Sequence, residues 1–163
     1  MNILFVCSGN TCRSPMAEAL FDDEVERSSK LKGRVKSQSA GSFAAEDAEA
    51  TEEAIEVMDE MGLDIKRHRS QQFNSEIAEW ADLILTMEAR HIEELEAMSP
   101  KTEHKMHTLL GWLNGVEGFP GDDNYNIYDP YKEPLEEYRE CAIEIKSAII
   151  KLIKKLENTI QDE

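Results

Sequence analysis

The chain has 163 residues and a formal net charge of -16. This length predicts one domain over residues 1–163 that buries roughly two-thirds of its unfolded surface and needs no disulfide or metal to fold. The acidic charge argues against nucleic acid and anionic membranes as partners, because both are polyanions. Three cysteines, no signal peptide and no apolar run of about 18 residues favour reduced thiols in a cytoplasmic protein. We expect a monomer.

Apolar runs and helical periodicity alternate along the chain. In chain order they predict a strand over 2–6, a helix over 15–28, a short strand over 34–39, a helix over 51–61, a short helix over 75–80, a strand over 82–87, a helix over 88–98, a short strand over 105–108, a loop over 115–126 and a helix over 133–157. This alternation predicts an α/β fold, a doubly wound parallel sheet with helices on both faces. Such sheets bind ligands beyond the carboxyl ends of their strands.

An oxyanion-binding motif follows the first predicted strand. Residues 7–14 read Cys-Ser-Gly-Asn-Thr-Cys-Arg-Ser, between the apolar run that ends at Val6 and the predicted helix. A cysteine attacks as its thiolate, and a strand-to-helix turn favours an anion through its free backbone N–H groups and the positive end of the helix dipole. Cys7 is therefore the candidate nucleophile and Arg13 the candidate oxyanion clamp. The competing interpretation is that Cys7 is an inert buried thiol at the end of a strand.

The residues inside this motif suit a loop that curls around one phosphate. Gly9 permits a close approach and an unusual backbone angle, and Asn10 tolerates the left-handed conformation. Pro15 suits the first position of the helix, where its missing N–H is not needed. Ser14 is a candidate helix cap, and its hydroxyl is also expected to reach the sulfur of Cys7.

Four segments share the motifs of one protein family. They are Cys7-Ser8-Gly9-Asn10-Thr11-Cys12-Arg13-Ser14, Ser39-Ala40-Gly41, His68-Arg69-Ser70 and Asp129-Pro130-Tyr131, and they span nearly the whole chain. In these segments the chain resembles the low-molecular-weight protein phosphatases. The resemblance implies a four-stranded sheet of order 2-1-3-4, phosphorylated proteins as partners, and a phosphate-binding loop formed by Ser8, Gly9, Asn10, Thr11, Cys12 and Ser14.

The chemistry also needs an acid, because the leaving group must take a proton and a water must later lose one to break the phosphocysteine. Asp129 is the candidate for both steps. By itself it is an ordinary turn aspartate before a proline. The resemblance strengthens the catalytic interpretation, because the Asp-Pro motif of the family also precedes the final helix.

His68 is the candidate support of the loop. The resemblance implies that this histidine forms hydrogen bonds with Asn10 and Ser14. The alternative is an ordinary surface histidine. Gln71 occupies a position where many bacterial relatives carry an arginine. The contact that this arginine makes beside the histidine is therefore not expected in this chain.

The cysteines and histidines give further alternatives. Cys12 either fills the floor of the loop or captures an oxidised Cys7 as a disulfide, which would protect the nucleophile. Cys141 is expected to be inert. The spaced cysteine pair of the arsenate reductases with this fold is missing, which disfavours that activity. No histidine shows metal-ligand spacing with the cysteines, and no glycine-rich nucleotide loop is present, so we expect no metal and no cofactor.

Substrate choice depends on three residues. At position 11 this chain resembles the protein-arginine phosphatases, which also have threonine. The tyrosine-specific relatives commonly carry isoleucine or leucine at this position. The smaller side chain leaves room for a planar guanidinium, which Asp129 is able to pair with. Phe43 and Tyr131 are candidate aromatic walls. We therefore favour phosphoarginine as the substrate, with phosphotyrosine as the alternative substrate. The alternative to an enzyme is an inactive phosphate-binding module, which holds phosphorylated partners without turnover.

Overall fold

A computed structural model describes residues 1–160 of the chain. It contains one parallel sheet of four strands in the order β2-β1-β3-β4. The strands are β1 (Asn2–Cys7), β2 (Lys36–Gly41), β3 (Leu83–Thr86) and β4 (Met106–Thr108). The apolar run in β1 is buried on both faces of the sheet, which is why it reads as a continuous hydrophobic segment. The predicted α/β class and strand order are confirmed.

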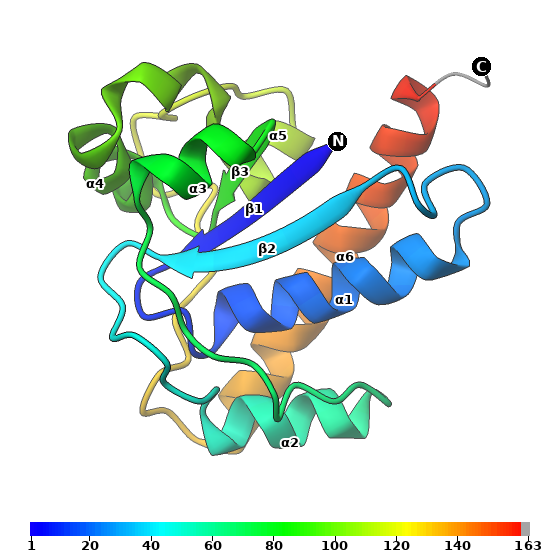
Figure 1. The fold of residues 1–163 in the computed structure, drawn as a ribbon. Coiled ribbons are helices and arrows are strands. Elements are labelled where there is room, and N and C mark those ends of the chain that lie inside the picture. The colour runs from blue at the N-terminus through cyan, green and yellow to red at the C-terminus, as the bar shows by residue number, and fades with distance from the viewer. Residues whose placement is uncertain (161–163) are drawn as a thin grey trace.

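Helices cover both faces of the sheet (Figure 1). They are α1 (Arg13–Arg27), α2 (Glu52–Glu60), α3 (Ser75–Trp80), α4 (Ala89–Met98), α5 (Leu109–Leu113) and α6 (Leu135–Thr159), with a 3-10 helix η1 (Pro100–Lys105). One hydrophobic core lies between the sheet and helices α1, α2, α5 and α6, and a second lies between the sheet and helices α3 and α4. Both cores contain side chains of β1, which lies at the centre of the sheet. A loop follows the carboxyl end of this strand.

The start of helix α1 differs from the sequence prediction. Helix α1 begins at Arg13, so Pro15 is its third residue and not its first. Ser14 lies inside the first turn, and the helix cap is Cys12, whose side chain makes no capping hydrogen bond. The prediction of Ser14 as the cap was wrong because the loop backbone winds directly into the helix, where the N–H of Met16 already donates to the carbonyl of Cys12. The short helices α5 and η1 were not predicted.

Candidate active site

The candidate loop connects the end of β1 to the start of α1. Its close packing against β2 depends on Gly41, which pairs in register with Cys7. A Cβ atom at Gly41 would lie only 2.5 Å from the carbonyl oxygen of Ser8, so a larger residue cannot fit without moving the loop. Gly9 has no such constraint, and its φ is not positive. The unusual backbone angle predicted for Gly9 is instead that of Asn10, whose φ is 56°.

The sulfur of Cys7 lies 2.9 Å from the hydroxyl oxygen of Ser14. The same oxygen accepts a hydrogen bond of 2.8 Å from the side-chain amide of Asn10. Because a hydroxyl has a single hydrogen, and Asn10 occupies the oxygen as a donor, the hydrogen of Ser14 is free to point at the sulfur. Cys7 and Ser14 are both buried, so this contact lies in a region with little water.

Asn10 is fully buried, and its side chain connects three segments of the chain. Its amide nitrogen also donates to the hydroxyl of Ser39 at 2.9 Å, and its amide oxygen accepts from the backbone N–H of Gln71 at 3.0 Å. Ser39 in turn donates to the carboxylate of Glu18 at 2.5 Å. Burial raises the pKa of Glu18 to about 7, although the hydrogen bond from Ser39 opposes that rise. A chain of hydrogen bonds therefore runs from the half-buried carboxyl group of Glu18 to Cys7.

His68 supports the loop through the backbone. Its Nε2 lies 2.7 Å from the carbonyl oxygen of Asn10. Burial lowers the pKa of His68, so the ring is neutral at pH 7 and donates this hydrogen bond through Nε2. The contact that the resemblance implied with Ser14 is not formed, because Asn10 and Cys7 already occupy that hydroxyl. Gln71 contributes the backbone bond to Asn10 and a side-chain bond of 2.9 Å to the carbonyl of Ser39.

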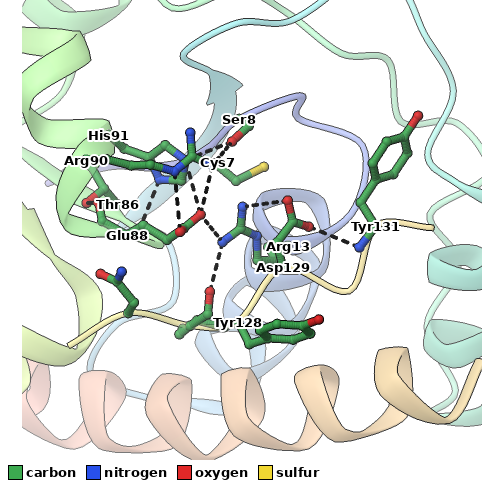
Figure 2. Close-up of polar contacts among 12 residues, drawn as sticks. Cys7, Ser8, Arg13, Thr86, Glu88, Arg90, His91, Tyr128, Asp129 and Tyr131 are labelled. Atoms are coloured by element: carbon green, nitrogen blue, oxygen red, sulfur yellow. Dashed lines mark hydrogen bonds and ion pairs between the residues drawn. The ribbon is translucent and has the colours of Figure 1, made fainter. Parts of the chain in front are cut away.

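Arg13 is almost completely buried, and acceptors surround it (Figure 2). Its Nη1 donates to Glu88 at 2.7 Å and to the carbonyl of Ile127 at 2.8 Å, and its Nη2 lies 3.3 Å from Asp129. Burial opposes the charge, but the nearby acidic groups of Cys7, Asp129 and Glu88 outweigh it and raise the pKa of Arg13. Within residues 1–160, its Nε has no hydrogen-bond partner. This buried donor is left for a ligand.

Sequence reasoning missed the cluster formed by Glu88, Arg90 and His91. Glu88 caps α4 and joins the guanidinium groups of Arg13 and Arg90, at 2.7 and 3.1 Å (Figure 2). His91 is fully buried, and its Nδ1 accepts from the N–H of Glu88. Burial, followed by the charge of Arg13, lowers the pKa of His91 to about 3, so the ring is neutral. The available signal was position, since Glu88 follows β3, the neighbour of β1.

Above the loop lies a cavity of about 330 Å³. Its lining includes the predicted residues Cys7, Ser8, Gly9, Thr11, Cys12, Arg13, Phe43, Asp129 and Tyr131. Ala45 and Ala48, which sequence reasoning did not single out, complete the wall. Asp129 is held at the mouth, where one carboxylate oxygen accepts from the N–H of Tyr131 at 3.1 Å. The structure thus brings the predicted nucleophile, clamp, acid and specificity residues around one cavity, whereas Asn10, Ser14 and His68 lie behind the loop.

The other cysteines are buried thiols. Burial, followed by the acidic groups of Cys7 and Asp129, raises the pKa of Cys12 to about 11. Burial likewise raises the pKa of Cys141 to about 12. Among residues 1–160, no group of three or more His, Cys, Asp or Glu side chains is arranged to hold a metal ion. No helix in that same range is long and apolar enough to span a membrane.

A parallel α/β sheet whose central strand ends in a cysteine-to-arginine loop over a cavity defines the class of small cysteine-dependent phosphatases. The family model of the low molecular weight phosphotyrosine protein phosphatases matches residues 2–162. The chain therefore belongs to this family, as the sequence motifs predicted, and it is an enzyme of this class.

Individual relatives extend along nearly the whole chain. A protein-arginine-phosphatase of Geobacillus stearothermophilus is 39% identical over 155 residues, 95% of each chain. A low molecular weight protein tyrosine phosphatase from T. tengcongensis is 40% identical, with a TM-score of 0.83 over 95% of this chain and 99% of that one. The arginine phosphatase YwlE, as a cysteine-to-serine mutant with its active-site serine phosphorylated, is 34% identical, with a TM-score of 0.85 over 96% of each chain.

Proposed function

We propose that this enzyme hydrolyses phosphorylated side chains of proteins through a phosphocysteine intermediate, with Cys7 as the nucleophile. The observation that carries the proposal is that one cavity is lined both by Cys7 and by Arg13. The sulfur of Cys7 lies next to the hydroxyl of Ser14, and the guanidinium of Arg13 is buried. The Nε of Arg13 lacks a partner within residues 1–160 and is available to a phosphate oxygen. The phosphorylated active-site serine of the related YwlE mutant supports the same attachment point.

The first step transfers the phosphoryl group to sulfur. The thiolate of Cys7 attacks phosphorus and forms a P–S bond, while the bond from phosphorus to the substrate atom breaks. The N–H groups of the loop and Arg13 stabilise the charge that develops on the phosphoryl oxygens. Ser14, 2.9 Å from the sulfur, stabilises the thiolate before attack and again when it leaves.

Asp129 carries the protons. Its carboxyl group donates a proton to the leaving nitrogen or oxygen as the substrate bond breaks, and its carboxylate then takes a proton from the attacking water. That water breaks the P–S bond and releases inorganic phosphate. The position of Asp129 in the lining of the cavity that also contains Cys7 supports this assignment.

Phosphoarginine is the favoured substrate. Thr11 lines the cavity and is smaller than the isoleucine or leucine of tyrosine-specific relatives, and Asp129 offers a carboxylate to the planar guanidinium. The arginine phosphatase from G. stearothermophilus supports this preference. Phosphotyrosine is the second candidate, because Phe43 and Tyr131 are exposed aromatic walls and the T. tengcongensis relative is a tyrosine phosphatase.

The test compares phosphate release from two peptides that differ only in carrying phosphoarginine or phosphotyrosine, with Cys7→Ser as the blank. We expect faster release from phosphoarginine and loss of that preference in Thr11→Ile. Thr159→Ile, at the exposed end of α6 and away from the cavity, is the matched control. Faster release from phosphotyrosine would reverse the substrate assignment. Tight binding of both peptides with no release at any pH would instead support a binding module without turnover.

A further inference from the structure

A second hollow lies beside the catalytic cavity, on the face formed by the end of α4 and the segment after β2. It measures about 590 Å³ and is lined mainly by Ser8, Ser42, Phe43, Arg90, Ala97 and Met98. Ser8 and Phe43 also line the catalytic cavity, so the two hollows adjoin each other. We call the second hollow the α4 groove. A substrate chain that extends past Phe43 from the cavity would lie along its rim.

Apolar surface dominates the α4 groove and is open to solvent. The side chain of Phe43 is 89% exposed and that of Met98 is 39% exposed. Large apolar side chains gain free energy when they are covered, so this pair is suited to an apolar ligand. The one cation in the groove, Arg90, is already paired with Glu88 and Glu94, at 3.1 and 3.3 Å. An acidic ligand therefore finds little unbalanced positive charge there.

The groove also offers one oriented donor, the hydroxyl of Ser8. Its oxygen lies 3.0 Å from Nε2 of His91 and accepts from Arg90 at 2.8 Å. Since Nδ1 of His91 accepts from the N–H of Glu88, Nε2 carries the hydrogen and also donates to Ser8. Two donors thus fill the lone pairs of Ser8 (Figure 2), and its own hydrogen has no acceptor among residues 1–160.

A second hydroxyl in the groove wall, that of Ser42, has no hydrogen-bond partner among residues 1–160. This residue is buried. Unpaired buried polar groups are uncommon in folded proteins, and each calls for an explanation such as a ligand or a water. The hydroxyl of Ser8 beside an exposed apolar surface matches the chemistry of an extended peptide, which offers carbonyl oxygens and side chains together.

We propose that the α4 groove binds an apolar side chain of the substrate protein next to the phosphorylated residue, while Ser8 donates to a backbone carbonyl of that substrate. The inference rests on the proposed function and specifies which protein sequences the enzyme prefers. Neighbouring side chains of an extended peptide point to opposite sides. Phe43, between the two hollows, therefore separates the phosphorylated side chain from its apolar neighbour.

The test uses two peptides with the same phosphorylated residue, flanked by leucine in one and by asparagine in the other. The readout is kcat/KM for each peptide divided by kcat/KM for p-nitrophenyl phosphate, which is too small to reach the groove. Partial burial of one leucine predicts a preference of about tenfold for the leucine peptide. Met98→Glu and Ala97→Glu are expected to reduce it to below about threefold. Ile143→Glu, at an exposed apolar position on α6, is the control.

The outcomes separate the inference from the proposed function. Equal ratios for the two peptides, or an unchanged preference in both groove variants, would overturn the inference. Absence of phosphate release by the unmodified protein from p-nitrophenyl phosphate and from both peptides would instead overturn the proposed function. Concentration-dependent dimerisation that Met98→Glu abolishes, measured by sedimentation, would assign the groove to a second copy of the chain and would also overturn the inference.

Discussion

The half-buried carboxyl group of Glu18 is expected to make the stability of the protein depend on pH, and Glu18→Gln is expected to remove this contribution. Burial raises the pKa of Glu18 from an ordinary 4.5 to about 7, so the folded state holds a proton that the unfolded chain has lost. Between pH 4.5 and 7 the unfolded state binds fewer protons, and the free energy of unfolding falls as the pH rises. The loss begins near the unfolded pKa and is complete above the folded one.

The magnitude follows from the two pKa values. A difference of about 2.5, at about 1.36 kcal/mol for each pKa unit, sets an upper limit of about 3 kcal/mol. Asp22, whose own pKa is raised by burial, faces the same hollow as Glu18, together with the carboxyl groups of Asp23, Glu26 and Asp64 and the ring of His68. The charge of Asp22 opposes ionisation of Glu18, so the glutamine variant also relieves this repulsion above pH 7.

The assay is guanidinium chloride unfolding, followed by circular dichroism at pH 5 and pH 8, for the unmodified protein and for Glu18→Gln. The stability of the variant relative to the unmodified protein is expected to increase by up to about 3 kcal/mol between the two pH values. Glu24→Gln, on the same helix, controls for loss of one negative charge. A relative stability that stays constant to within about 0.5 kcal/mol would refute the argument that burial keeps Glu18 protonated.

Three further predictions concern the catalytic cavity. Asp129→Asn is expected to lower kcat for phosphopeptides by about 10² to 10⁴, measured as phosphate release, with Asp64→Asn as the control; an unchanged kcat at every pH would remove Asp129 from the mechanism. Glu88→Gln removes a charged partner of Arg13 and is expected to weaken inhibition by inorganic phosphate about tenfold. Unchanged inhibition would show that Glu88 does not position Arg13. After treatment with peroxide, dithiothreitol is expected to restore the activity of the unmodified protein but not that of Cys12→Ser, and equal recovery would leave Cys12 as a filler of the loop.

The sequence by itself determined the features that depend on neighbouring residues. The apolar run of β1, the loop from Cys7 to Arg13 and the amphipathic periodicity of α6 lie within single short segments, where local sterics and helical spacing act directly. The alternation of strands and helices then leads to a parallel sheet with its ligand site at the carboxyl ends. The candidate loop could be located from this information alone.

Only the tertiary structure decided which distant groups contact that loop. Glu88 lies 75 residues from Arg13, and His91 lies 83 residues from Ser8. The hydrogen bonds from Asn10 to Ser39 and from Ser39 to Glu18 likewise join residues 29 and 21 positions apart. Such contacts depend on the order of the strands and on the packing of each connection across the sheet. A glutamate or a histidine in a helix carries no local signal of its partner, because the partner is set by the fold and not by neighbours in the chain.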